Sequence, residues 1–192
     1  QAVLFFDQHE QSAGEQQADE KGGVEQFAKD MAVSFLNATL AVVKASGYGS
    51  DTVSVAQYLE QQGVDYFAVA YTDEGIALRE SGVKTPILVL HPQLQNLELI
   101  IKYKLEPNLY SKKIFLSFLD IIATAGIHDY PIHLKFNTGL NRLGFKASDV
   151  DFLFPYLKGQ NSILVKSIFS HLVASEDENE RQRTLLQIKK FE

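Results

Sequence analysis

The stretch that decides the fold is Leu40-Ala41-Val42-Val43-Lys44-Ala45-Ser46-Gly47-Tyr48-Gly49-Ser50. Its apolar half has the composition of a short strand that is buried on both faces. Lys44 ends the apolar run, a turn with two glycines follows, and a helix is expected to begin near Asp51. A buried strand followed at once by a helix is the repeating unit of a parallel sheet.

The same stretch carries groups that suit a reactive ligand. A lysine at the end of a buried strand is costly unless its ammonium is solvated, paired or used in chemistry. Its amine can form a Schiff base with an aldehyde, and the N–H groups of a helix N-terminus favour an anion. Tyr48 adds a hydroxyl in the turn. The stretch therefore offers an amine for an aldehyde and a cradle for a phosphate, although a solvated Lys44 beside a simple turn explains the same residues.

Working outward, apolar runs and amphipathic segments alternate from Leu40 to the last residue. The expected strands are residues 40–44, 66–70, 87–90, 108–110, 132–136 and 163–169. The expected helices are residues 51–62, 72–81, 93–104, 112–125, 148–158 and 176–192. Six βα units in succession predict an α/β fold with a parallel sheet.

Reactive side chains follow the ends of these strands, as they do on the active face of a (β/α)₈ barrel. An open doubly wound sheet binds ligands at the same edge, but no GxGxxG motif follows any strand. A full barrel needs roughly 250 residues, so we expect about six of eight βα units and a fragment of a longer protein. Its first and sixth strands are expected to be unpaired edges.

The residues before Leu40 are less regular. Residues 3–7 form a short strand candidate, and residues 8–23 are rich in Gln, Glu, Ala and Gly with weak periodicity. Apolar residues recur at three- and four-residue spacing over residues 24–37. That spacing predicts an amphipathic helix.

Composition excludes several classes of protein. The chain has 192 residues, 45% of them apolar and 22% charged, which is ordinary for a globular domain with one sizeable core. A net charge of −6 without a basic stripe weighs against nucleic-acid binding. No run of eighteen apolar residues suggests a membrane span, and no N-terminal signal pattern is present. The absence of cysteine fits a reducing cytosol.

A second unusual stretch runs from Ile132 to Phe145. It places Lys135 inside a buried strand and Arg142 seven residues later, after a glycine turn. Two cations that converge on one pocket need an anion or a modification to reconcile them. A surface loop with two unrelated cations remains the alternative.

Histidines supply a third candidate. His171 ends the strand 163–169 together with Ser170, although a lone strand-end histidine is more often a satisfied polar residue than a catalyst. His133 is expected on the same strand face as Lys135. The other histidines occupy loops, and no pair has the spacing of zinc ligands, so we expect no metal site.

Together these pieces resemble the alanine racemases, enzymes that use pyridoxal 5′-phosphate. The family's cofactor-lysine signature is similar to Ala41-Val42-Val43-Lys44-Ala45-Ser46-Gly47-Tyr48-Gly49. Its arginine loop is similar to the stretch from Leu134-Lys135 to Arg142-Leu143-Gly144-Phe145, and its next strand to Phe169-Ser170-His171. The order and separation of all three match over residues 40–192.

The resemblance implies a role for each candidate. Lys44 would form a Schiff base with the cofactor and serve as base or acid on one face of the substrate α-carbon. Tyr48 would bind the cofactor phosphate, and Arg142 its phenolic oxygen near the substrate carboxylate. Lys135 matches a lysine that is often carbamylated and then holds the arginine, and a carbamate would resolve the pair of cations. His171 matches the residue that stacks on the pyridine ring.

The resemblance also has departures. Residues 1–38 fit the family poorly apart from the opening strand, so we expect an N-terminal segment over 1–38 and a partial cofactor-binding barrel over 39–192. Ser50 stands where many members have histidine. The family's second catalytic tyrosine lies in a C-terminal β domain, which reaches across a homodimer interface and is expected beyond Glu192. The chain alone is therefore expected to be inactive.

The function that the resemblance implies is racemisation of L- and D-alanine in the cytoplasm, with D-alanine passed to peptidoglycan of the cell wall. The resemblance also includes racemase domains that are fused behind a cell-wall ligase in some bacteria. A related racemase or decarboxylase for another amino acid is one alternative. A non-catalytic barrel that binds pyridoxal phosphate is the other, although such proteins lack the arginine loop.

Overall fold

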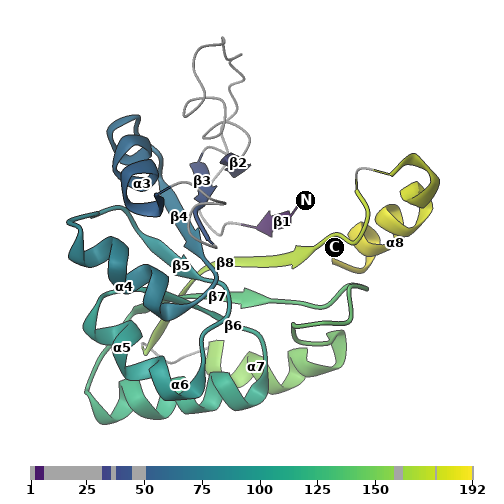
Figure 1. The fold of residues 1–192 in the computed structure, drawn as a ribbon. Coiled ribbons are helices and arrows are strands. Elements are labelled where there is room, and N and C mark those ends of the chain that lie inside the picture. The colour runs from purple at the N-terminus through teal and green to yellow at the C-terminus, as the bar shows by residue number, and fades with distance from the viewer. Residues whose placement is uncertain are drawn as a thin grey trace. The chain divides into compact units, whose positions relative to one another are not determined.

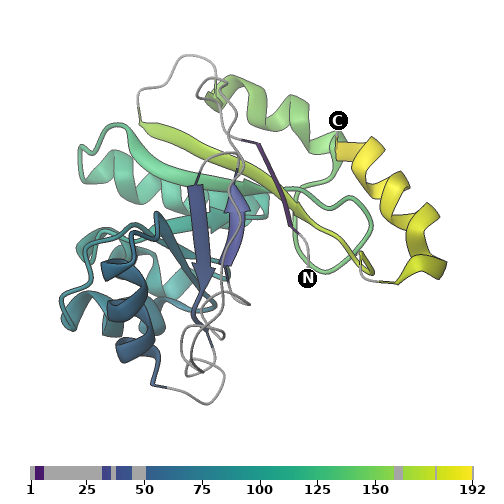
Figure 2. The same cartoon turned by 90° about the horizontal axis from the view of Figure 1, so that it is seen from above.

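The computed structural model describes residues 3–6, 32–35, 38–44, 51–157, 162–175 and 177–191 (Figures 1 and 2). The chain divides into two compact units. The first comprises residues 9–107, and the second comprises residues 1–8 with residues 108–192. Strand β6 (Glu106–Leu109) contributes to both.

In the unit of residues 9–107, parallel strands alternate with helices. Its elements are β2 (Ala32–Phe35), β3 (Ala38–Val42), α3 (Thr52–Gln61), β4 (Tyr66–Val69), α4 (Thr72–Glu80), β5 (Ile87–Val89), η1 (Leu94–Asn96), α5 (Leu97–Lys102) and the start of β6. Strands β3, β4, β5 and β6 pair in parallel in that order, and β2 pairs antiparallel with β3.

The second unit repeats the alternation. Its elements are the end of β6, α6 (Lys112–Thr124), β7 (Tyr130–Lys135), η2 (Ala147–Asp149), α7 (Val150–Leu157), β8 (Ile163–His171), η3 (Glu178–Glu180), α8 (Arg181–Phe191) and β1 (Val3–Phe6). Strands β6, β7 and β8 are parallel, and β1 pairs antiparallel with β8.

Each unit has its own apolar core. In the first, Leu40, Ala68 and Leu88 pack together on three neighbouring strands. In the second, helix α6 begins where the Ser111 hydroxyl accepts a hydrogen bond from the N–H of Ile114. Its buried residues recur at three- and four-residue spacing, so that Phe115 and Phe118 lie on one face. Phe115 contacts Phe145 edge to face, which ties the helix to the loop after β7.

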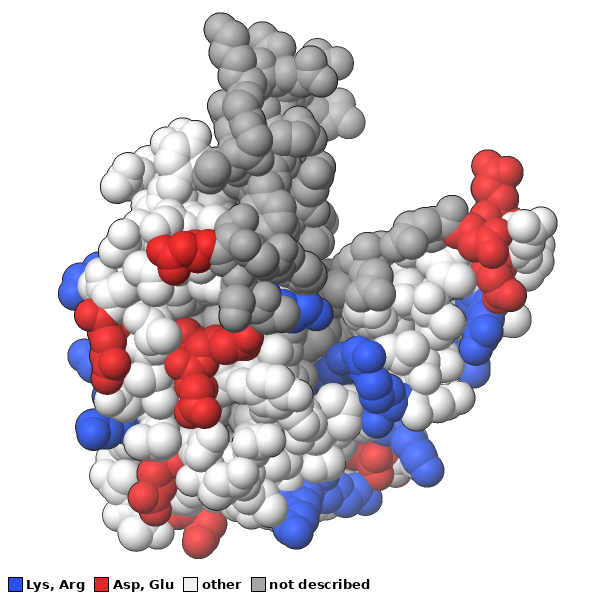
Figure 3. Space-filling model, in the orientation of Figure 1, with Lys and Arg blue, Asp and Glu red and all other residues white. Residues whose placement is uncertain are grey.

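Six parallel strands that alternate with helices confirm the expected α/β class. Element boundaries differ from the sequence-based expectation by a few residues, most at the last helix, where α8 begins at Arg181 rather than at residue 176. On the face drawn in Figure 3, acidic and basic side chains are mixed over the described surface. Among the described residues, no helix is both long and apolar enough to cross a membrane.

Two expectations about the N-terminal residues and the sheet edges were wrong. The helix expected over residues 24–37 is contradicted by β2, which occupies Ala32–Phe35; residues 24–31 lie outside the described part. The first and sixth parallel strands are not open edges, because β2 pairs with β3 and β1 pairs with β8. Backbone pairing along an edge satisfies N–H and C=O groups that would otherwise be exposed.

Candidate functional site

Lys44 lies two residues beyond the end of β3 and is half-buried. The ladder continues past the strand end, since the N–H of Val43 donates to the carbonyl of Ala68 at 2.9 Å. Leu40 belongs to the cluster with Ala68 and Leu88, and Val42 packs against it. Because side chains alternate between the two faces of a strand, residue 44 is expected on the same face as residues 40 and 42. The sequence-based placement of Lys44 at a strand end is confirmed, whereas Tyr48 lies outside the described residues.

The helix that follows begins with its own carboxylate cap. The Asp51 side chain accepts hydrogen bonds from the N–H of Val53 at 3.4 Å and of Ser54 at 3.1 Å. Hydrogen bonds from Ser54 hold the pKa of Asp51 below its ordinary value. Two of the N–H groups that we expected to favour a phosphate are therefore already bonded to an acid. Lys44 still supports the expectation of an amine for an aldehyde. The N-terminus of α3 does not support the expectation of a phosphate site.

Lys135 is the last residue of β7 and is only 7% exposed. Its Nζ lies 5.6 Å from the centroid of the Phe169 ring on the neighbouring strand. Two positions earlier, His133 is also buried, and its Nδ1 lies 2.6 Å from the Ser167 hydroxyl. The expectation of a lysine buried within this strand is confirmed.

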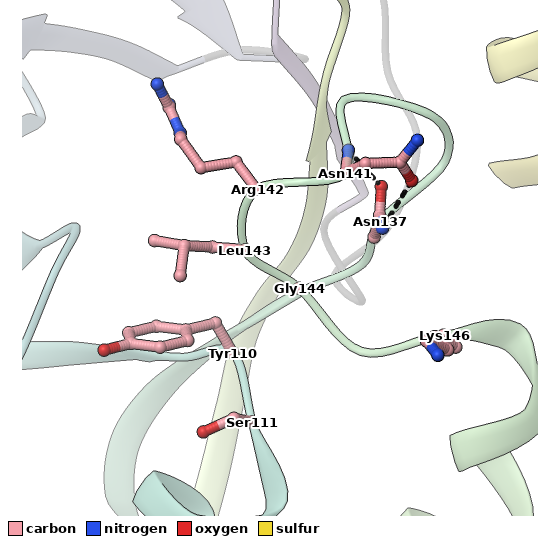
Figure 4. A pocket seen from close by; sticks show the side chains of 8 residues that line it. All are labelled: Tyr110, Ser111, Asn137, Asn141, Arg142, Leu143, Gly144 and Lys146. Atoms are coloured by element: carbon pink, nitrogen blue, oxygen red, sulfur yellow. Dashed lines mark hydrogen bonds between the residues drawn. The ribbon is translucent and has the colours of Figure 1, made fainter.

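Arg142 lies on the loop of residues 137–144, which connects β7 to the helical turn η2. The loop closes where the N–H of Asn137 donates to the carbonyl of Phe145, and that of Phe145 donates to the carbonyl of Lys135, both at 2.8 Å. The Asn137 Oδ1 accepts from the N–H of Gly139 and of Asn141, and its Nδ2 donates to the Asn141 side chain. One amide thus holds the residue directly before Arg142 (Figure 4).

Gly144 is required where the loop returns to the strand. Its φ of +130° is a backbone conformation that residues with a side chain rarely adopt. A Cβ at this position would lie 2.7 Å from both the Asn137 nitrogen and the Phe136 carbonyl carbon. The glycine lets the two ends of the loop approach each other closely enough to hydrogen-bond.

A pocket of about 420 Å³ opens beside this loop, a volume typical of small-molecule sites. It is lined by Tyr110, Ser111, Asn137, Asn141, Arg142, Leu143, Gly144 and Lys146. The side chains of Tyr110, Arg142 and Leu143 point to the same side of the loop (Figure 4). Burial raises the pKa of the Tyr110 hydroxyl, so this group stays a neutral donor near neutral pH. The exposed guanidinium of Arg142 and the phenol of Tyr110 both line this pocket, and the guanidinium can bind an anionic oxygen.

The carboxyl end of β8 lies under the same loop. Thr138 Oγ1 lies 2.8 Å from Ser170 Oγ, which also donates to the carbonyl of Phe136 at 2.9 Å. The next residue, His171, ends β8 and is half-buried. Its carbonyl accepts a hydrogen bond from Gln187 of α8 at 3.2 Å. Lys135 and His171 therefore end the neighbouring strands β7 and β8, and Arg142 lies on the loop after β7. Of these three sequence-predicted residues, Arg142 is the one that lines the pocket.

Sequence reasoning missed several residues of this arrangement. Tyr110 follows β6 directly, and its position after a strand end was a usable signal. For the hydrogen bond between Thr138 and Ser170, the only sequence signal was that both residues lie in polar segments after expected strands. Gln187 carried no local signal, because its partners are 14 to 49 residues away.

Comparison with known proteins matches most of the chain to one family model, described as the N-terminal domain of alanine racemase, over residues 26–192. Alanine racemase from Synechocystis sp. is 37% identical over 142 residues, which are 73% of this chain and 38% of that protein. Alanine racemase from Fusobacterium nucleatum is 36% identical over 154 residues, 79% of this chain and 42% of that protein.

Solved structures agree with this match. Alanine racemase from Clostridium difficile 630 superposes with a TM-score of 0.76 at 28% identity, covering 88% of this chain and 44% of that one. The enzyme from E. faecalis gives a TM-score of 0.72 at 29% identity, over 88% of this chain and 45% of that one. The chain spans about two fifths of the length of the curated relatives it matches. Its fold is part of the (β/α)₈ barrel of these proteins.

Proposed function

Since this chain belongs to the alanine racemase family, we propose that it forms part of a pyridoxal-phosphate-dependent enzyme that interconverts L- and D-alanine. The observation that carries the proposal is a single feature of the second unit. The loop that matches the family's arginine loop presents Arg142 to a pocket directly after the buried Lys135. A non-catalytic cofactor-binding barrel would not need this loop.

The residues present suit pyridoxal phosphate. The cofactor brings an aldehyde and anionic oxygens. Lys44 of the first unit offers an amine for the aldehyde, and Arg142 of the second unit lines a pocket and offers a guanidinium for an anionic oxygen. His171 ends β8 next to Ser170, on the strand that packs under the loop of Arg142. Tyr48 is proposed as a phosphate ligand on the resemblance alone. When bound, the cofactor supplies an electron sink that makes the α-proton of the amino acid acidic.

The chain's own residues would then do three things. Lys44 removes or returns the α-proton on one face of the substrate, as a general base and acid. Arg142 binds and orients an anionic oxygen at the pocket, for which its planar guanidinium has the right donor geometry. Lys135, buried at the end of the strand that leads into the loop, would hold Arg142 in place if its amine were carbamylated.

Other parts of the proposal rest on the family alone. They are a homodimer, a second catalytic base from a further domain of the partner, a cytoplasmic location and the use of D-alanine in peptidoglycan. The division of the chain into a segment over residues 1–38 and a partial barrel over 39–192 is likewise a proposal. The single sequence that would test them most directly is that of the full-length gene.

The experiment is to express the full-length protein and follow the conversion of L- to D-alanine. We expect turnover and a visible absorption band of bound cofactor, and we expect Lys44→Ala to lose the band and at least about 10²-fold in rate. Lys84→Ala is the matched control, because Lys84 is exposed in the same unit and far along the chain from β3. A Lys44→Ala protein that keeps a borohydride-reducible link to the cofactor would refute the assignment of Lys44. Turnover of serine or a basic amino acid in place of alanine would refute the substrate.

A further inference from the structure

Gln187 has an environment unlike that of any other described residue of α8. It is 2% exposed, and it is the one buried residue among residues 181–191. A buried amide is retained only where its donors and acceptor find partners. Gln187 Oε1 accepts from the N–H of Val173 at 3.0 Å, and its Nε2 donates to the His171 carbonyl and to Thr138 Oγ1, each at 3.2 Å.

These contacts begin a directed chain of hydrogen bonds. Ser170 Oγ donates to the carbonyl of Phe136, so its lone pairs remain for Thr138, whose hydroxyl proton points to Ser170. Thr138 Oγ1 in turn accepts from Gln187 Nε2. Each hydroxyl therefore donates once and accepts once. Among these hydrogen-bonded groups, the Gln187 amide is the donor at the beginning of the series. Buried chains of this kind are stable only when every member is present.

The chain reaches the loop that carries Arg142. Thr138 is 5% exposed and lies four residues before Arg142, and the Asn137 side chain holds the intervening Asn141. The loop also packs directly on the glutamine, because a Cβ at Gly139 would lie 3.2 Å from Gln187 Cγ. The Val173 hydrogen bond ties Gln187 to the segment after β8, whereas the Thr138 hydrogen bond ties it to the loop.

We propose that Gln187 is a positioning residue that sets the loop of Arg142 against the end of β8 at His171. Its effect on the reaction rests on the proposed function, since that function assigns Arg142 and His171 to the cofactor. Its effect on the loop does not, because all of its partners belong to this unit of the chain.

The test is the rate of trypsin cleavage after Arg142, which is expected to rise with the fraction of protein in which the loop is open. We expect Gln187→Met and Thr138→Val each to raise the rate of cleavage after Arg142 about tenfold, because each breaks the hydrogen bond between Gln187 and Thr138. Thr138→Ser keeps the hydroxyl and should behave as the original chain. Gln182→Met, on the exposed face of α8, is the matched control. Cleavage after Arg79, in the other unit, should not change.

A second readout uses the full-length enzyme. We expect kcat/KM for alanine to fall about tenfold in Gln187→Met and in Thr138→Val, and in the double variant to fall by less than the product of the two effects, because both changes remove the hydrogen bond between Gln187 and Thr138. If Gln187→Met fails to fold, Thr138→Val carries the same expectation from the other side of the bond.

The outcomes separate the two proposals. Unchanged cleavage after Arg142 in a destabilised Gln187→Met protein would show that Gln187 only docks α8, and multiplying effects of the two changes would overturn the shared bond. If the full-length protein does not racemise alanine, the proposed function fails. The cleavage rates then still decide the positioning of the loop.

Discussion

At the scale of single residues, the question is how the charge of the buried Lys135 side chain is compensated. Its side chain is buried at the end of the strand that leads into the loop of Arg142, and a buried ammonium is costly unless something offsets it. Contact with the face of the Phe169 ring supplies part of that offset. A carbamate on Nζ would instead make the group an anion that can hold the arginine.

We expect full-length protein prepared with ¹³C-bicarbonate to show a carbamate carbon signal that Lys135→Ala abolishes. Loss of the group that orients Arg142 should also lower kcat/KM about 10²-fold, since small misplacements of a positioning group cost this much. Small added carboxylates should restore part of the rate. Lys113→Ala, at an exposed position of α6, is the control that keeps both signal and rate. Persistence of the signal in Lys135→Ala would place the carbamate elsewhere.

At the scale of elements, Glu60 joins α3 to the segment before β5. Its Oε1 accepts hydrogen bonds from the N–H of Lys84 and of Thr85 at 2.7 Å, and from the Thr85 hydroxyl at 2.8 Å. Desolvation raises the pKa of this carboxyl, but the hydrogen bonds from Thr85 and Lys84, with the charge of Arg79, outweigh it. The pKa is therefore lowered from the ordinary value of 4.5.

A lowered pKa in the folded state means that the folded protein binds the proton less readily than the unfolded chain. The stability that Glu60 contributes is therefore fully present above pH 4.5 and is lost as the pH falls through the lower folded pKa. We expect Glu60→Ala to cost about 1–2 kcal/mol in urea unfolding at neutral pH, since it leaves two N–H groups without their acceptor. The difference should shrink below the ordinary pKa. Asp120→Ala, at an exposed position of α6, is the control, and a difference that is independent of pH would contradict the assignment.

Elements with strong local signals were predicted correctly, and those decided by distant partners were not. The six parallel strands follow from apolar runs bounded by turns, and α6 follows from its apolar spacing. Strand β2 was predicted as helix because its residues also fit a three- and four-residue spacing, whereas pairing with β3 decides its conformation. Lys135 and Arg142 were found through their unusual charge. Gln187 and Glu60 are polar residues on helices, and their hydrogen-bond partners lie far along the chain. The residues next to them in the sequence therefore give no signal of their structural role.

At the scale of the whole molecule, the first and sixth parallel strands bear on what this chain can do alone. Because β2 and β1 pair with them, neither strand is left as an open edge that could pair with another copy of the chain. The expected lack of activity has a different basis. The chain spans about two fifths of the length of its curated relatives, and the proposed function needs a second acid–base group that we propose lies in a further domain.

We therefore expect residues 1–192, expressed alone, to racemise alanine at least about 10²-fold more slowly than the full-length protein, because one of two acid–base groups is missing. Lys44 can still exchange the α-proton on its own face, so slow incorporation of solvent deuterium with retained configuration should persist when cofactor is added. Lys44→Ala should abolish this exchange, and Lys84→Ala should not. The measurements are optical rotation for racemisation and mass spectrometry for deuterium. Racemisation by a monodisperse monomer at the full-length rate would show that Lys44 needs no partner base, and the two-base assignment would then be wrong.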